Sequence, residues 1–262
     1  MILDEIVAEK HRARAARDPS STKRALAAIA DSPPPRSLRD ALSPTGAGAI
    51  RVIAEFKRRS PSAGAILPDG ASVSSVAAAY AEAGAAALSI LTDEKFFGGS
   101  LGDLASARRA AALPILRKDF ALFDDDLADA RAAGADAVLL IARLLDDRRL
   151  RALLDEAARL RLDALVEVHA AEECCRAVDA GALLVGVNHR DLDTLAIDLA
   201  LSEKLAPLIP GDVVRVAESG LRTAADAREM AARGYHAVLV GEAFLRAPSP
   251  GAALRAWVSP CG

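Results

Sequence analysis

The sequence predicts an α/β protein in which eight parallel strands close into a (β/α)8 (TIM) barrel. Short apolar runs alternate with alanine-rich helical stretches, and the repeat length is about 25 residues, as strand and helix alternation requires. Several helical stretches end at a glycine, which suits a left-handed helix C-cap before a strand. The strands are apolar on both faces, which is typical of a parallel sheet covered by helices.

Each strand is expected at a definite place in the repeat. Four runs follow a helix and a glycine, at residues 86–90, 137–141, 183–187 and 237–240. Four more lie between them, at 51–56, 113–117, 163–168 and 213–217. A doubly wound open sheet is the alternative, but no glycine-rich dinucleotide fingerprint follows the first strand. Eight evenly spaced units therefore favour the closed barrel.

Residues 1–49 precede this repeat and predict a helical N-terminal extension. An amphipathic helix is expected at about 3–16, and a second helix follows Asp18-Pro19-Ser20. Three prolines at 33–35 stiffen the next connection. This segment is too short for an independent core, so we expect it to pack on the barrel and to cover one of its mouths. The chain is thus a single domain, with the extension at 1–49 and the catalytic barrel at 50–262.

Composition and charge exclude several classes of partner. The 33 basic and 36 acidic residues are interspersed and give a net charge of −3, so neither nucleic acid nor a membrane surface is an expected partner. No apolar run reaches the roughly 20 residues of a membrane-spanning helix. The amino terminus does not resemble a secretory signal, because Asp4 and Glu5 fall within its apolar stretch. We expect a cytoplasmic protein.

The cysteines and histidines predict neither disulfides nor a metal site. Cys174 and Cys175 are adjacent and Cys261 is near the end, so the three cysteines form no disulfide framework. The four histidines lack the paired spacing of zinc ligands. We expect no metal and no cofactor.

Charged and amide side chains occupy strand ends where a buried strand would be apolar. Because side chains alternate between faces, Glu55 and Lys57 point the same way as Ile53. Four further strands end in a polar residue, namely Lys118, Glu167, Asn188 and Glu218. Interior ion pairing is the structural alternative. Convergence of so many such groups at one mouth instead favours a catalytic site, since unpaired buried charge costs several kcal/mol.

Glycine-containing turns follow the last two strands and predict a phosphate site. Ser219 and Gly220 come after the seventh strand, and Gly241 and Glu242 after the eighth. Barrels commonly present backbone N–H groups and a helix N-terminus to a phosphate at this position. After the first strand, a loop at 60–64 begins with Ser60, which can hydrogen-bond an anion. Each of these turns alone would be an ordinary connection.

The segments that carry these residues resemble the indole-3-glycerol phosphate synthase family. Six motifs appear in the family's order, IAEFKRRSPS, LSILTDEKFF, ILRKDF, LVEVH, GVNHRDL and AESG, beginning at residues 53, 88, 115, 165, 186 and 217. The resemblance implies closure of the ring of 1-(2-carboxyphenylamino)-1-deoxyribulose 5-phosphate with loss of carbon dioxide and water, without a cofactor. Two departures are Ala63, where many members carry lysine, and Gly98, where asparagine is frequent.

The resemblance also implies roles for individual residues. Lys118 is expected to be the general acid and Glu167 the general base. Lys57 holds the carboxylate or the phosphate of the substrate, or protonates the departing hydroxyl, and Glu55 orients one of the two lysines. Asn188 and Arg190 are expected to contact the carboxylate and hydroxyls of the substrate. Phe96 and Phe97 are expected to pack on its aromatic ring or only in the protein.

Two other functions are compatible with these residues. One is a different phosphate-binding barrel enzyme, such as a Schiff-base aldolase using Lys57 or Lys118, or phosphoribosylanthranilate isomerase. The isomerase is the weaker alternative, because the two adjacent cysteines fall in a helical stretch. The other is a non-catalytic binder of a phosphorylated ligand. We expect a small phosphorylated substrate and a monomer or weak homo-oligomer.

Overall fold

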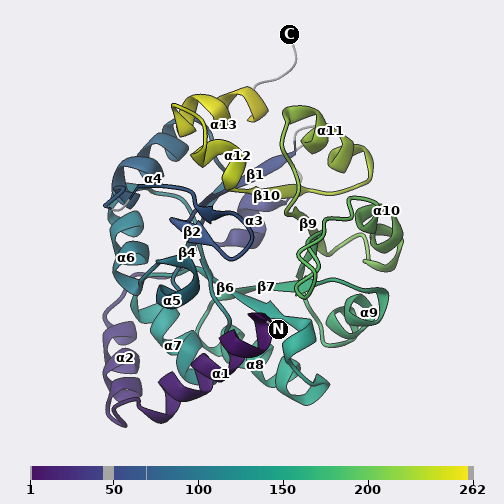
Figure 1. Cartoon of the computed structure of the whole chain (residues 1–262). Helices are drawn as coiled ribbons and strands as arrows, with labels where there is room; N and C mark the ends of the chain where they lie inside the picture. The colour runs from purple at the N-terminus through teal and green to yellow at the C-terminus, as the bar shows by residue number, and fades with distance from the viewer. Residues whose placement is uncertain (1, 44–49, 69, 259–262) are drawn as a thin grey trace.

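The computed structural model describes residues 2–43, 50–68 and 70–258 and shows a closed barrel of eight parallel strands (Figure 1). The strands follow one another around the barrel in chain order, and the last pairs with the first. They are β1 (Arg51–Phe56), β4 (Ala87–Leu91), β5 (Ile115–Lys118), β6 (Ala137–Ile141), β7 (Asp163–Val168), β8 (Leu184–Asn188), β9 (Val214–Glu218) and β10 (Ala237–Val240). The predicted barrel is confirmed, with four strands displaced from their predicted bounds by one or two residues.

Helices surround the barrel and connect successive strands. The longer ones are α4 (Val73–Glu82), α6 (Leu101–Ala110), α7 (Asp124–Ala132), α8 (Asp147–Arg159), α9 (Ala171–Asp179), α11 (Ala224–Ala232) and α13 (Pro250–Val258). Shorter pieces are α5 (Glu94–Phe97), α10 (Leu201–Leu205), α12 (Glu242–Leu245) and the 3₁₀ turns η1 (Ala142–Leu144) and η2 (Ala206–Leu208). The glycines predicted as helix C-caps all have positive φ, between 84° and 95°, at Gly84, Gly134, Gly181 and Gly234.

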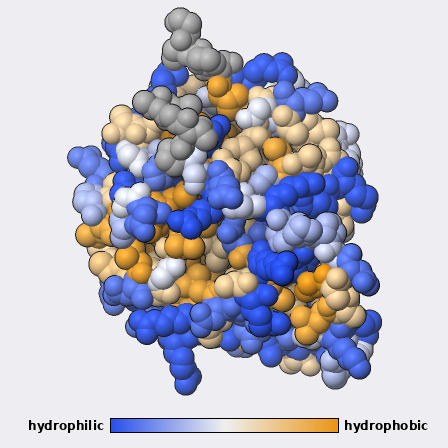
Figure 2. Space-filling view, turned by 180° about the vertical axis from the view of Figure 1, so that it is seen from behind, coloured by the Kyte–Doolittle hydropathy of each residue, from blue (hydrophilic) through white to orange (hydrophobic). Residues whose placement is uncertain are grey.

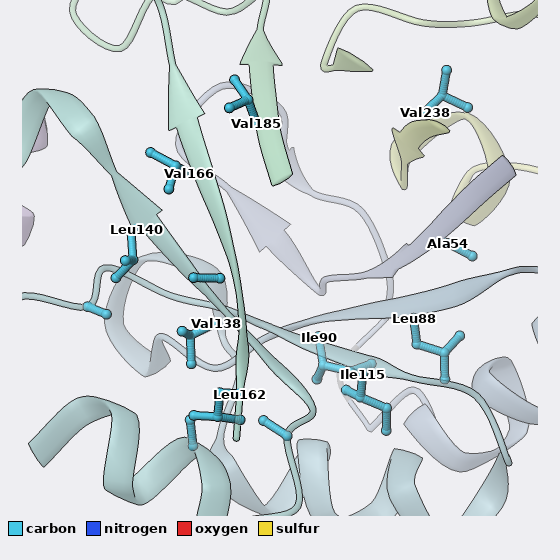
Figure 3. Packing of buried hydrophobic residues seen from close by; sticks show 14 of the residues in the cluster. Ala54, Leu88, Ile90, Ile115, Val138, Leu140, Leu162, Val166, Val185 and Val238 are labelled. Carbon is cyan, nitrogen blue, oxygen red and sulfur yellow. The ribbon is translucent and has the colours of Figure 1, made fainter. Parts of the chain in front are cut away.

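Side-chain alternation along the strands creates two separate hydrophobic cores. One fills the barrel and contains Ile53, Leu116 and Leu165, all fully buried. The other lies between the strands and the helices and contains Val138, Val166 and others (Figure 3). The outer surface in the view of Figure 2 is a mosaic of hydrophilic and hydrophobic residues. The barrel interior is thus packed, and a cavity is left only toward its end.

The N-terminal extension contacts both ends of the barrel. Its helices are α1 (Ile2–Ala15), α2 (Ser21–Ala30) and α3 (Leu38–Leu42), and the boundary placed after residue 49 lies outside the described residues. Helix α3, which the sequence did not predict, inserts the fully buried Leu38 and Leu42 into the barrel core. It lies at the amino ends of the strands, because the Arg39 backbone N–H donates to Asp163 at the start of β7. Helix α1 lies at the opposite mouth, which its amino-terminal end reaches (Figure 1).

Ion pairs between distant parts of the chain help to hold the extension in place. Lys10 of α1 contacts Asp119 just after β5 at 2.5 Å, and Arg17 contacts Asp129 of α7. Helix α2 packs along α7. These contacts join residues that are more than a hundred positions apart in the chain.

The segment after β1 is more regular than the predicted loop. It folds back as a small antiparallel hairpin, β2 (Arg59–Ser60) with β3 (Gly64–Ala65). Arg58 anchors its base to α6 through both oxygens of Asp103, and Arg59 donates to the carbonyl of Glu94. The hairpin is therefore attached to the next βα loop.

Candidate active site

A cavity of about 450 Å³ opens at the carboxyl ends of the barrel strands. All but one of the predicted site residues line it: Glu55, Lys57, Ser60, Phe97, Lys118, Glu167, Asn188, Arg190, Glu218, Ser219, Gly220, Gly241 and Glu242. Phe96 is not part of the lining. The structure thus brings together side chains from seven strand ends and their loops, while their chemical roles stay predictions.

An ammonium and a carboxylate face each other at the floor of this cavity. Lys118 at the end of β5 donates to Glu167 Oε2 of β7 at 2.9 Å. Burial would lower the pKa of Lys118, but the negative charge of Glu167 above all raises it above its ordinary value. Burial would raise the pKa of Glu167, but Lys118 and His169 hold it well below its usual range. At neutral pH the lysine therefore has a proton to give and the glutamate can accept one.

Glu167 is held by two further side chains. Its Oε1 accepts a hydrogen bond from the Asn188 amide of β8 at 3.0 Å. The same oxygen lies 3.3 Å from Nε2 of His169. Asn188 is itself oriented, because its carbonyl oxygen accepts from the backbone N–H of Arg190. The carboxylate of Glu167 is thus held in one orientation by Lys118, Asn188 and His169. A fixed orientation suits a base that must accept a proton from one direction.

Glu218 of β9 is a second buried carboxyl group, and its protonation differs from that of Glu167. Its Oε2 lies 3.7 Å from Lys118 Nζ, and its Oε1 is buried without a hydrogen-bond partner. Burial, and then the nearby charge of Glu167, raise the pKa of Glu218 to about 8, so it is mostly protonated at neutral pH. Gly186 of β8 makes room for it, since a Cβ there would lie 2.0 Å from Glu218 Oε1.

The second lysine of the site, Lys57, follows β1 directly and is paired with a carboxylate of that strand. Lys57 Nζ donates to Glu55 Oε1 at 2.6 Å, and Ser89 of β4 donates to the other oxygen at 3.4 Å. Glu55 is 4% exposed. Of the two lysines that Glu55 was expected to orient, it contacts Lys57 directly. A second cation thus lines the same cavity as Lys118 and Glu167.

Backbone groups dominate the side of the cavity that lies between β9 and β10. Ser219 and Gly220 both have positive φ, at 64° and 79°. A Cβ on Gly220 would lie 2.6 Å from Ile197, so only glycine fits there. Gly241 precedes α12, and the first N–H groups of a helix have no partner within it. Two neighbouring turns therefore line the cavity with backbone groups, as expected for the predicted phosphate site.

The remaining wall is apolar. Phe97 and Phe120 lie with ring centroids 6.2 Å apart and both line the cavity. Helix α1 contributes Ile2, Leu3 and Ile6 to the same wall. Ser60 faces the cavity from the hairpin, where its hydroxyl accepts from the backbone N–H of Ala63. This wall is chemically suited to an aromatic ring.

Sequence reasoning missed several residues of the site. His169 appears only within a motif, although its position two residues after Glu167 signals that both leave the strand on the same side. Lys10, Asp119 and Gly186 carry no such signal. In the part of the chain that the structure describes, no three metal-binding side chains come together, and no helix has the length and apolarity to cross a membrane.

The fold and the site define a barrel enzyme with acid and base residues at the carboxyl ends of its strands. The family model described as indole-3-glycerol phosphate synthase matches residues 3–257, so the chain belongs to the indole-3-glycerol phosphate synthase family. A relative of that name from Opitutus terrae is 49% identical over 95% of this chain and 96% of its own. One from a Nocardioides species is 49% identical over 97% and 96%.

Solved structures of lower similarity share the fold. 3-Hexulose-6-phosphate synthase aligns over 80% of this chain and 100% of its own, with a TM-score of 0.61 and 19% identity. Thiamine phosphate pyrophosphorylase from Pyrococcus furiosus aligns over 84% and 96%, with a TM-score of 0.59 and 20% identity. At this level of identity the likeness concerns the barrel alone.

Proposed function

We propose that Lys118 and Glu167 are the acid and base with which this chain forms indole-3-glycerol phosphate. The family assignment makes the protein an indole-3-glycerol phosphate synthase, a carboxy-lyase of tryptophan biosynthesis. It closes the ring of 1-(2-carboxyphenylamino)-1-deoxyribulose 5-phosphate with loss of carbon dioxide and water. The observation that carries the proposal is the contact of Lys118 Nζ with Glu167 Oε2 at the cavity floor.

The ring closure needs an acid first. The aromatic carbon that bears the carboxylate attacks the ketone carbon, and Lys118 gives its proton to the ketone oxygen, which becomes a hydroxyl. Carbon dioxide then leaves with its bonding electrons returned to the ring, which restores aromaticity. Loss of the hydroxyl as water follows, and Glu167 takes the proton released as the indole forms. Lys57 is the second cation, available to the carboxylate that is lost or to the departing hydroxyl.

We also propose that the substrate spans the cavity in one orientation. The aromatic ring packs between Phe97 and the α1 residues, and the phosphate accepts from the backbone at Gly220 and Gly241. Arg190 and Ser60 provide further donors at the rim. The distribution of apolar and N–H groups within the cavity supports this orientation.

The cellular location, the partners and the oligomeric state of the enzyme are also proposals. The balanced charges and the cysteines Cys174 and Cys175, which are not joined by a disulfide, support a cytoplasmic enzyme with no nucleic-acid or membrane partner. We propose a monomer or weak homo-oligomer, which light scattering across a range of protein concentrations will test.

Substitution of the acid and the base tests the proposed chemistry. Lys118→Ala and Glu167→Gln are each expected to lower kcat by about 10²- to 10⁴-fold, the usual contribution of a positioned acid or base. Binding of the substrate, measured by calorimetry, should change little. Turnover is measured by the fluorescence of the indole product.

The exposed Lys204, whose partner Asp198 is also exposed, provides a matched control. Lys204→Ala should retain wild-type turnover. A Lys118→Ala enzyme with normal kcat would remove Lys118 from the mechanism. A wild-type protein that binds substrate without forming product would instead be a non-catalytic binder.

A further inference from the structure

His169 lies directly behind the proposed base. Its Nε2 is 3.3 Å from Glu167 Oε1, on the side of the carboxylate that does not face Lys118. Only 6% of the His169 side chain is exposed. The imidazole is therefore part of the buried environment of Glu167, although the cavity lining does not include it.

A second carboxylate lies on the other side of the ring. Nδ1 of His169 is 3.4 Å from Glu173 Oε2, in the first turn of α9. The same oxygen accepts a hydrogen bond of 2.7 Å from the backbone N–H of His169, which fixes its position. Both contacts of the ring have the separation of ion pairs rather than of in-line hydrogen bonds, and they place one imidazole between two carboxylates.

This environment keeps the ring charged. Burial disfavours the imidazolium, but the carboxylates of Glu167 and Glu173 outweigh it and raise the pKa of His169 to about 9. Groups on the surrounding elements complete the charge pattern: Lys118 from β5 and Asn188 from β8 contact Glu167, Glu218 of β9 lies beyond Lys118, and Arg143 of η1 acts on Glu173.

We propose that His169 is a positioning residue that, as a cation, keeps Glu167 ionised and correctly turned while Lys118 is without its proton. The proposal rests on the acid and base roles proposed above. Once Lys118 has protonated the substrate, Glu167 faces a neutral amine in a buried pocket next to the carboxylic acid of Glu218. Without another positive charge Glu167 would become protonated and be lost as a base. His169 supplies that charge and exchanges no proton with the substrate.

The charge of the ring is measured directly in the ligand-free wild-type protein. Two-bond ¹H–¹⁵N correlation spectra, assigned with His169→Asn, should show an imidazolium at pH 7.5 that titrates near pH 9. Glu173→Gln should lower this midpoint by about one pH unit, because it removes one of the two carboxylates. The neighbouring exposed Glu172 gives the matched control, and Glu172→Gln should leave the midpoint in place. A neutral ring at pH 7.5 would overturn the proposal.

The pH dependence of turnover separates positioning from a merely structural role. Wild-type kcat should fall above about pH 9, which gives the pH profile an alkaline limb. In Glu173→Gln the midpoint of this limb should lie about one pH unit lower. His169→Asn should lack the limb and show a roughly tenfold lower kcat with little change in KM. A limb that stays in place in both variants contradicts the proposal. Absence of activity in the wild type would refute the proposed function alone, because the ring titration does not depend on it.

Discussion

At the scale of single residues, three of the carboxyl groups that line the site have different surroundings. Glu55 is paired with Lys57, and Glu167 lies next to Lys118 and His169. Glu218 has only the more distant Lys118, at 3.7 Å. The charged form is therefore favoured for Glu167, while Glu218 keeps a proton. Environments that push the pKa values of neighbouring carboxyls apart are how one site provides a base and an acid at the same pH.

Glu218 should make folding stability depend on pH. Its pKa is about 8 in the folded protein against 4.5 ordinarily, so the folded state retains a proton that the unfolded chain loses. Stability from this group is therefore lost as pH rises from about 4.5 through 8. Glu218→Gln has no proton to lose, and at pH 8.5 its free energy of unfolding should exceed that of wild type by on the order of 2 kcal/mol. Urea unfolding at pH 5 and pH 8.5 measures the difference.

The exposed Glu203 provides a control with the same chemical change. Glu203→Gln should alter the free energy of unfolding by less than about 0.5 kcal/mol at both pH values. If Glu218→Gln lowered the free energy of unfolding by the same amount at pH 5 and pH 8.5, Glu218 would be ionised in the folded protein.

At the scale of elements, α3 acts as a plug for the amino-terminal end of the barrel. Leu38 and Leu42 are both fully buried within the interior core. Leu42→Ala is expected to cost about 2–5 kcal/mol of stability, as large-to-small substitutions in a close-packed core do. Because the site lies at the opposite end, kcat and KM at 25 °C should stay at wild-type values. Thermal unfolding and steady-state kinetics test both statements.

The matched control is Leu208→Ala, since Leu208 is 39% exposed. Its effect on stability should be within about 0.5 kcal/mol. A loss of turnover in Leu42→Ala at a temperature where the protein is folded would show that the plug and the site are coupled.

Among the ion pairs that join helix α1 to the barrel, those of Lys10 are the least exposed. Its ammonium contacts Asp119 and, at 3.7 Å, Asp93. Lys10→Met should loosen α1 and with it the wall formed by Ile2, Leu3 and Ile6. We expect KM to rise about five- to tenfold, equivalent to about 1 kcal/mol, with kcat little changed. Limited proteolysis should cleave the variant between α1 and α2 faster than wild type.

Arg24→Met removes an ion pair of the same extension that is exposed on both sides, with 64% and 57% of the two side chains accessible. It should leave KM and the cleavage rate unchanged. If Lys10→Met behaves like this control, α1 is held by its apolar contacts instead.

At the scale of the whole molecule, the periodicity of the sequence is enough to predict the barrel and to place the polar strand-end residues at one mouth. Strand-end residues such as Lys118 and Glu167 are predictable because alternation fixes their face and parallel strands share one end. Helix α3 is not, since five residues after three prolines are too few to show a helical period. The pairing of Lys10 with Asp119 is also not predictable, because it depends on the three-dimensional path of a segment outside the repeat.

Binding of phosphate at the turns after β9 and β10 should stabilise the entire barrel. These turns join the last two strands, and β10 closes the barrel against β1. A ligand that binds only the folded state adds about 1.4 kcal/mol at ten times its dissociation constant, which for a chain of this size raises Tm by about 3 °C. Calorimetry with inorganic phosphate, against chloride at equal ionic strength, measures the shift.

Two glycine variants locate the effect. Gly220→Ala forces a left-handed residue and a contact with Ile197, so its turn must move and phosphate should raise its Tm by less than half as much as in wild type. Gly211→Ala places a methyl group where nothing lies within 4 Å and should keep the full shift. Each comparison is made within one variant, with and without phosphate, so any loss of intrinsic stability cancels. Equal protection of both variants would place phosphate elsewhere than at the turn after β9, and the predicted orientation of the substrate would then be wrong.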